Sequence, residues 1–278
     1  MSNPLFIINE LSCSYKRGPA VLSIRNLEIP RNKFVVLIGR SGSGKSTLLE
    51  TLGLMNNTIA TGDVIFFPDL EAAPISYTKL WGQNKASELA KVRRESFSFI
   101  FQNTNLMPNF TAYENACLSQ MIQGKPYLEA VENVRMMMSQ LGLSNVPEWK
   151  QAVELSGGQR QRLAFVRAIT ASFKVLFGDE PTGNLDEFNS DDLMMQLNNN
   201  LSQNERSVII VSHNILLSVK YADIIIVLEK PRNSAECVVI ENRHMYHKDN
   251  SLKRWWNNEG MEIEDIVSTL QSILCIRK

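Results

Sequence analysis

The stretch FVVLIGRSGSGKSTLLETL, residues 34–52, decides the fold. It begins with an apolar run of strand length, passes through a glycine-rich turn, and ends in a segment with helical spacing of leucines. The turn, GRSGSGKST at 39–47, matches the pattern G-x-x-x-x-G-K-[ST] between a strand and a helix, which is the setting of a phosphate-binding loop. A chance match in a chain of this length has a frequency of roughly 1%. The alternative is a glycine-rich turn without a ligand, and the flanking strand and helix disfavour it.

Each part of this loop has a physical role in holding phosphate. The glycines allow the loop to wrap with its N–H groups pointing inward, and the following helix adds the positive end of its dipole. Lys45 would reach the β- and γ-phosphates of a nucleotide, and the Ser46 hydroxyl would ligate Mg²⁺. The residues expected to contact the nucleotide here are Gly39, Ser41, Gly42, Ser43, Gly44, Lys45, Ser46 and Thr47.

A second stretch, VLFGDEPTGNLD at 175–186, supplies carboxylates. An apolar strand ends at Asp179, which could approach Mg²⁺ through water. Glu180 lies one residue beyond, where a carboxylate can polarise an attacking water. The alternative is that the pair forms an acidic cap on the next helix. The phosphate-binding loop favours the catalytic interpretation.

Apolar strand-sized runs alternate with helical patterns along the chain, which predicts an α/β domain with a largely parallel core sheet. The first strands look like an antiparallel fringe, and residues 112–171 read as an inserted helical subdomain without a convincing strand. The predicted strands lie at 5–8, 34–38, 64–67, 97–101, 175–177, 207–212, 224–228 and 237–240, and the predicted helices at 44–55, 112–142, 158–171 and 187–203.

Composition excludes several classes of protein. The 278 residues contain 29 basic and 29 acidic side chains, which argues against nonspecific nucleic-acid binding as the main activity. The four cysteines are far apart and form no C-x-x-C pair, so neither a zinc site nor a disulfide framework is expected, and a reducing compartment fits best. The first residues do not read as a signal peptide, and the longest apolar runs are too short to cross a bilayer.

The stretch ELSGGQRQR at 154–162 places two glycines at the start of an otherwise good helix. Each glycine weakens a helix by roughly 1 kcal/mol relative to alanine. One explanation is a simple turn. The other is that backbone N–H groups here approach a negatively charged group closely.

With these motifs together, the chain resembles the nucleotide-binding subunits of ATP-binding-cassette (ABC) transporters over roughly residues 4–230. The phosphate loop, LSGGQ, DEP and a strand-terminal histidine occur in the order and at the spacing of that family. The resemblance implies an ATPase that uses ATP and Mg²⁺ and works as a head-to-tail homodimer. It also implies that LSGGQ caps the γ-phosphate bound by the opposite subunit, through Ser156, Gly157, Gly158 and Gln159.

The resemblance also assigns roles to isolated residues. Gln102 matches the glutamine that touches Mg²⁺ and the attacking water and faces the membrane subunit. His213 matches the switch histidine of the γ-phosphate, although a lone strand-end histidine is usually structural. Tyr15 matches the aromatic that stacks on adenine; the alternative is a tyrosine packed on the fringe sheet. Residues 184–186 match the loop through which the two sites communicate.

FQNTNLMPNFTAYENA and DEPTGNLD look like the branch that contains lipoprotein-releasing, macrolide-efflux and cell-division ATPases. Its partners are integral membrane permeases, typically with four spanning helices and large extracytoplasmic domains. The expected location is the cytoplasmic face of the cell membrane, with Gln102–Tyr113 as the docking surface. Two departures from the family pattern are a missing proline before LSGGQ and Asn214 in place of aspartate. The alternative function is a soluble ABC scaffold of the iron–sulfur assembly type; the cargo cannot be read from the sequence.

The expected domains are the ATPase domain at 1–240 and a C-terminal extension at 241–278. Residues 261–276 predict an amphipathic helix capped by Asn257 or Asn258. Three surfaces could cover its apolar stripe: its own domain, which we favour, a partner subunit, or a bilayer. The stripe consists of Ile263, Ile266, Val267, Leu270, Ile273 and Leu274.

Overall fold

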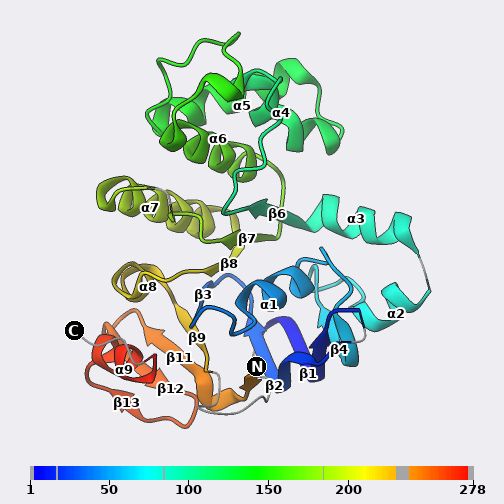
Figure 1. Ribbon diagram of the computed structural model, residues 1–278, viewed down its shortest axis with the longest axis vertical. Coiled ribbons are helices and arrows are strands. Elements are labelled where there is room, and N and C mark those ends of the chain that lie inside the picture. Colours follow the sequence, from blue (N-terminus) through cyan, green and yellow to red (C-terminus); the bar gives the residue numbers. More distant parts are fainter. Residues whose placement is uncertain (1–2, 17, 84, 184, 230–237, 275–278) are drawn as a thin grey trace.

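The structure is a computed structural model that describes residues 3–16, 18–83, 85–183, 185–229 and 238–274. Its centre is an eight-stranded sheet in the order β13-β12-β11-β9-β3-β8-β7-β6 (Figure 1). The strands from β9 to β6 are all parallel, and they are mostly apolar because both faces of the sheet are covered. They are β3 (Phe34–Gly39), β6 (Phe97–Ile100), β7 (Val175–Asp179), β8 (Ser207–Val211) and β9 (Ile224–Leu228).

A second sheet of five strands, in the order β10-β2-β1-β4-β5, forms the predicted antiparallel fringe. Only the pairing of β10 with β2 is parallel. Its strands are β1 (Pro4–Ser14), β2 (Ala20–Pro30), β4 (Ile59–Phe66), β5 (Ile75–Ser76) and β10 (Val238–Ile240).

The two faces of the central sheet pack into two separate cores. Val35 and Leu37 of β3 join the core shared with the five-stranded sheet and with α1 (Lys45–Leu52). Val36 and Ile38 point the other way, into a core shared with α7 (Glu187–Asn204) and α8 (Ile215–Tyr221). This alternation follows from the two-residue period of a strand. The phosphate-loop strand is thereby fixed from both sides.

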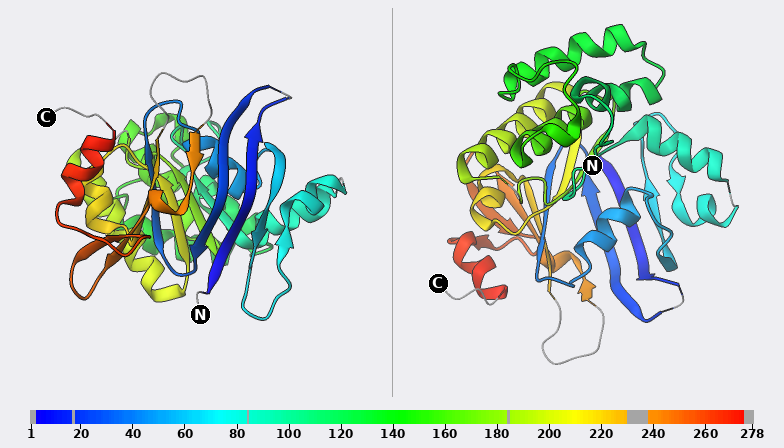
Figure 2. Two further views of the ribbon diagram at one scale, coloured as in Figure 1. Left: turned by 90° about the horizontal axis from the view of Figure 1, so that it is seen from below. Right: turned by 45° about the horizontal axis from the view of Figure 1, so that its top comes forward.

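The helical layer at one end of the molecule contains α4 (Ala112–Ile122), α5 (Tyr127–Gln140), the short 3₁₀ helix η1 (Ala152–Glu154) and α6 (Gly157–Ile169) (Figures 1 and 2). The helical pattern at 112–142 is two helices, since the chain turns at Gly124 with φ of 90° and Pro126 then precedes α5. Two helices that the sequence did not predict, α2 (Tyr77–Gly82) and α3 (Ala86–Ser96), lead from the five-stranded sheet to β6.

The C-terminal segment is built differently from the prediction. A short 3₁₀ helix, η2 (Asn242–His244), precedes β11 (Met245–Asp249), and then β12 (Arg254–Asn257) and β13 (Glu262–Ile263) extend the central sheet antiparallel from β9. The final helix, α9, spans Ile266–Ile273 and is capped by Asp265. The prediction of a helix from 261 capped by Asn257 or Asn258 was therefore wrong, because residues 262–263 pair with the two tryptophans of β12.

The apolar stripe of α9 packs on its own domain, as favoured from the sequence. Ile266, Leu270 and Leu274 are buried in the core that contains the helical layer and α7. The helix contacts α8 directly (Figure 2). Among the described residues, no helix combines the length and the apolar composition that crossing a bilayer requires.

Candidate functional site

The phosphate loop joins the end of β3 to the start of α1 through backbone conformations that favour glycine. Gly42 and Gly44 have φ of 74° and 87°, in the left-handed region. Gly39 is required for a different reason: an added Cβ would lie 2.5 Å from the Ser43 Oγ and 2.6 Å from the Leu228 carbonyl oxygen. The loop is therefore a close-fitting backbone cradle.

Lys45 lies inside this cradle. Its Nζ donates to the carbonyl oxygens of Gly39 and Arg40, both at 2.9 Å, and the residue is only 6% exposed. Burial lowers the pKa of Lys45, and the neighbouring carboxylates of Glu180 and Asp179 oppose that shift. The Lys45 ammonium group thus lies next to the loop backbone, where its hydrogen bonds go to neutral carbonyl oxygens. A phosphate bound in the loop would place a negative charge beside this buried positive charge.

Ser46 and Asp179 form the second part of the site. The Ser46 hydroxyl donates to the Asp179 Oδ1 at 3.4 Å. Burial raises the pKa of Asp179, the Ser46 hydrogen bond lowers it, and the charge of Glu180 raises it. A hydroxyl beside a carboxylate is the donor pair that Mg²⁺ takes when substrate phosphates and water complete its ligands.

A nucleotide and Mg²⁺ fit these residues. The Ser43 Oγ is buried and has no hydrogen-bond partner in the described part of the chain, so a polar group of the cradle is left for a ligand to satisfy. Among the described residues, no cluster of three or more His, Cys, Asp or Glu side chains could hold a metal. A Mg²⁺ ion would therefore depend on the predicted ligands Ser46, Asp179 and Gln102, together with oxygens of the nucleotide and of water.

The structure brings the three predicted catalytic residues together around Glu180. His213 Nε2 lies 2.6 Å from one carboxylate oxygen of Glu180, and Gln102 Nε2 donates to the other at 3.2 Å. Glu180 has φ of 48°, a left-handed conformation that is costly for a residue with a side chain and that marks functional sites. Its backbone N–H donates to the Val211 carbonyl of β8 at 3.1 Å, which fixes this turn against the sheet. Two side chains thus hold one carboxylate at the end of β7.

Tyr15 directly follows β1, and its side chain lies against α1, the helix that follows the phosphate loop. Its hydroxyl is 3.1 Å from the Thr47 Oγ1 and donates to Glu50 at 3.1 Å. The residue is 43% exposed, so it is not packed away within the five-stranded sheet. Burial of the hydroxyl raises the pKa of Tyr15. The position leaves ring surface open beside the phosphate loop.

LSGGQ begins α6 in the helical layer, apart from the phosphate loop (Figure 1). Ser156 and Gln159 form a reciprocal capping box at 3.2 and 3.0 Å. An added Cβ at Gly157 would meet no atom within 4 Å, and at Gly158 only the Leu185 Cδ2 at 3.9 Å. Packing within the chain therefore does not require the glycines. They leave the amino end of α6 open to an approaching group.

Several supporting residues were not found from the sequence. The Arg167 guanidinium is 8% exposed and donates to the carbonyls of Thr104 and Asn105, both at 2.8 Å, which fixes the loop after Gln102. The buried Gln161 amide donates to the Pro181 carbonyl at 2.7 Å, next to Glu180. The one sequence signal for Gln161 and Arg167 is their position on the buried face of the predicted helix α6.

The two departures from the family pattern have structural replacements. Asn214 caps α8 by accepting from the Leu217 N–H at 3.0 Å, as an aspartate would. In place of the missing proline, Gln151 and Glu154 form a capping box around η1. Of the predicted communication loop at 184–186, residue 184 lies outside the described residues.

Comparisons of the sequence with known proteins also indicate an ATP-binding cassette, in agreement with the geometry of the site. Residues 22–183 match the family described as ABC transporter. The chain is 34% identical over 218 residues to the lipoprotein-releasing system ATP-binding protein LolD of Rhodopseudomonas palustris, a match that covers 77% of this chain and 89% of LolD. It is 35% identical over 229 residues to the macrolide export ATP-binding/permease protein MacB of a Shewanella species, covering 81% of this chain and 33% of MacB.

Solved structures agree as well. The dimeric bacterial ABC transporter cassette MJ0796 superposes with a TM-score of 0.70 at 28% identity, over 80% of this chain and 93% of that one. A second structure of MJ0796, a post-hydrolysis state bound to ADP and Pi, has the same TM-score. These relatives favour the transporter interpretation over the iron–sulfur scaffold. The chain belongs to the ABC transporter family, as an ATP-binding ATPase cassette related to LolD and MacB.

Proposed function

We propose that the chain hydrolyses Mg²⁺-ATP at two equivalent sites of a head-to-tail homodimer and thereby drives a separate membrane permease. The observation that carries the proposal is Glu180, held between His213 and Gln102 at the strand end next to Asp179, Ser46 and Lys45. A carboxylate so placed suits proton removal from an attacking water. No other arrangement among the described residues combines a phosphate cradle with a positioned base.

In this proposal the residues of the site divide the work of binding and catalysis. Lys45 and the loop N–H groups bind the β- and γ-phosphates, and the ring of Tyr15 stacks on the adenine. Ser46, Asp179 and Gln102 would hold Mg²⁺, which supplies charge neutralisation on the phosphates. Glu180 accepts the proton of the attacking water, while His213 and Gln102 fix its orientation.

LSGGQ completes the site of the second copy. Its glycine pair is not required within the chain, and Ser156 with the amino end of α6 forms an anion-binding surface. Each cassette carries one phosphate loop and one LSGGQ, so a head-to-tail pair contains two complete sites. ATP then joins the two subunits, and hydrolysis separates them.

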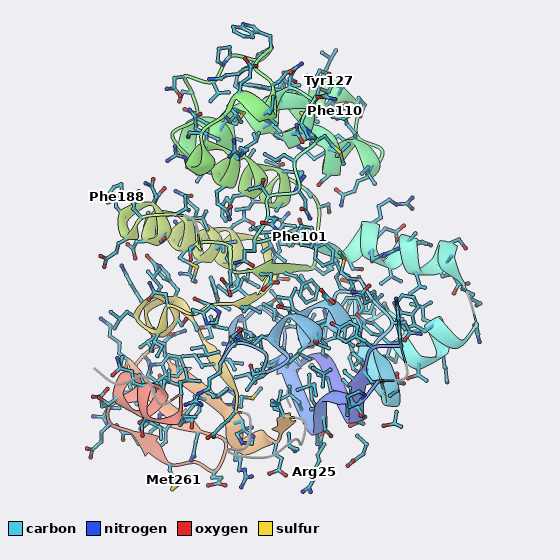
Figure 3. The ribbon with its side chains drawn as sticks, viewed as in Figure 1. Arg25, Phe101, Phe110, Tyr127, Phe188 and Met261 are labelled. Atoms are coloured by element: carbon cyan, nitrogen blue, oxygen red, sulfur yellow. The ribbon has the colours of Figure 1, made fainter. Side chains whose placement is uncertain are left out.

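The proposed docking surface for the permease is the loop at 102–113. Met107 and Phe110 are 46% and 43% exposed, and Phe110 lies on the outside of the helical layer (Figure 3). The fully buried Asn115 amide holds this loop from beneath, with hydrogen bonds to the backbone of Met107 at 2.7 and 3.0 Å. The backbone is therefore fixed while apolar side chains remain exposed, which suits a preformed interface. The partner that we propose is an integral membrane permease, comparable to the permease part that the MacB relative carries in its own chain, with this ATPase on the inner face of the membrane.

Substitution of Glu180 by Gln tests the proposed base. Glu180→Gln should retain ATP binding, lose at least about 100-fold in turnover, and accumulate the ATP-bound dimer, because the amide cannot accept the proton. Turnover is measured by phosphate release with Mg²⁺ and dimer formation by light scattering. Glu129→Gln, the same change at the exposed start of α5, is the control. Native turnover in Glu180→Gln would show that the base is another group.

A further inference from the structure

The C-terminal extension contacts the phosphate loop through the side chain of Arg40. The Arg40 Nε donates to the carbonyl oxygen of Leu274 at 3.0 Å, across 234 positions of the sequence. Leu274 is the C-cap of α9, so the arginine binds the negative end of a helix dipole. Sequence patterns give no indication of this contact.

The backbone of Arg40 also forms hydrogen bonds within the phosphate loop. Its own carbonyl accepts a hydrogen bond from the Lys45 Nζ at 2.9 Å and another from the Ser43 N–H at 3.1 Å. The end of α9 is therefore connected to the lysine ammonium group through the Arg40 side chain and backbone. A displacement of α9 would therefore shift Arg40 and, with it, the Lys45 ammonium group at the proposed phosphate site.

The extension also contacts helix α8, which follows the second loop that we propose to face the nucleotide. α9 packs against α8, the helix that begins directly after His213 and Asn214 (Figures 1 and 2). From β11, the Lys248 Nζ donates to the carbonyls of Val219 and Lys220 in the last turn of α8, at 3.1 and 2.9 Å. One added segment thus contacts both Arg40 of the phosphate loop and the helix that follows His213.

We propose that α9 is a brace for the phosphate loop, with Arg40 as the positioning residue through which it acts. A glycine-rich loop is conformationally free, and ordering it on binding lowers affinity for the ligand. Because Arg40 is already held at the end of a packed helix, less conformational entropy is lost when the loop becomes ordered around the nucleotide. The brace raises the affinity for nucleotide without touching it. This inference rests on the proposed role of Lys45 in phosphate binding.

The first test removes the arginine. Arg40→Ala in the full-length chain should weaken binding of a fluorescent ATP analogue about three- to tenfold, within the range found for indirect coupling. The melting temperature without nucleotide should change little, since Arg40 is exposed. Arg25→Ala is the matched control, because it removes an arginine that pairs with Glu241 at 3.0 Å on another sheet. An unchanged dissociation constant in Arg40→Ala overturns the brace.

The second test asks whether Arg40 acts through α9. Leu274→Ala loosens the end of the helix that carries the carbonyl, and Asp265→Ala, which removes the helix cap at 3.0 Å from the Ser268 N–H, is the milder variant if the first does not fold. Either should weaken binding to a similar degree as Arg40→Ala. Combined with Arg40→Ala, neither should weaken it further, because the connection is already broken.

In this second test, three outcomes overturn the brace: α9 variants that bind nucleotide normally, losses that multiply in the double variants, or tighter binding when α9 is loosened. Multiplying losses would mean that Arg40 contacts the nucleotide independently of α9. Lys45→Ala separates this inference from the proposed function. Normal nucleotide binding by Lys45→Ala would overturn both, whereas a loss there with normal binding by the α9 variants would overturn the brace alone.

Discussion

Burial of Asp179 at the carboxyl end of β7 raises its pKa above the usual value of an aspartate. For a carboxylate with a raised folded-state pKa, the ionised form destabilises the folded protein above that pKa, and the cost disappears as the pH falls through it. In the proposed function the same ionised form would bind Mg²⁺. Asp179 would then combine a stability cost with a binding role, as active-site residues often do.

Asp179→Asn should separate the two effects. We expect the nucleotide-free protein to melt at a higher temperature at neutral pH, because the buried charge is removed and the amide can still accept from Ser46. Mg²⁺-dependent ATP binding should weaken at least about tenfold. The stabilisation should shrink as the pH is lowered and Asp179 of the wild type becomes protonated. A variant that melts lower at neutral pH, with unchanged ATP binding, would contradict both parts.

Sequence predicted the residues of the site unevenly. The phosphate loop and the DE pair are each local patterns, so spacing alone located Lys45 and Glu180. Gln102 is 78 positions from Glu180, and only the family resemblance could join them. Arg167 and Gln161 act through backbone carbonyls of other segments, which no side-chain pattern records.

Among the elements, the central strands were predicted because burial on both faces makes them continuously apolar, as in β9. β2 was missed, since its burial is interrupted by exposed Arg25 and Asn26 in the middle of the strand. β11 and β12 are polar strands at one side of the sheet, and their sequences MYHKD and RWWN do not show their partners. The helical layer was predicted, but not the turn that divides α4 from α5.

The start of α6 allows a test at the level of one helix. Ser156→Ala should lower the free energy of unfolding by about 1 kcal/mol through loss of the cap. Thr111→Ala at the start of α4 removes an equivalent capping box and should cost about the same. Only Ser156→Ala should impair the ATP-bound dimer of the Glu180→Gln protein, because only that hydroxyl is proposed to meet a nucleotide. If the two variants dimerised equally well, Ser156 would act only as a helix cap and would not contact the nucleotide.

At the scale of the whole molecule, the loop at 102–113 is proposed to connect the ATPase to its permease. Phe110→Glu should reduce co-purification with the membrane fraction at least about tenfold while leaving nucleotide binding unchanged, because a charge would be buried at the interface. Leu70→Glu is the control, since Leu70 is 76% exposed and lies in another part of the molecule. Membrane association that survives Phe110→Glu would place the docking surface elsewhere.

The C-terminal extension tests how far the cassette depends on its added segment. Of the residues that the structure describes, truncation after Asn250 removes four whose side chains are at most 6% exposed: Trp255, Ile266, Leu270 and Leu274. At about 1.5–3 kcal/mol each, their burial contributes on the order of 6–12 kcal/mol before entropy, which is comparable with the whole stability of a typical domain. The isolated subunit should therefore lose its cooperative melting transition or its solubility. Met261→Ala is the control within the same segment, because that side chain is 55% exposed and its loss should leave melting unchanged. Met261 lies at the edge of the molecule (Figure 3). If the truncated subunit instead kept its melting temperature and lost only assembly with the permease, the buried face of α9 would belong to the partner rather than to this domain.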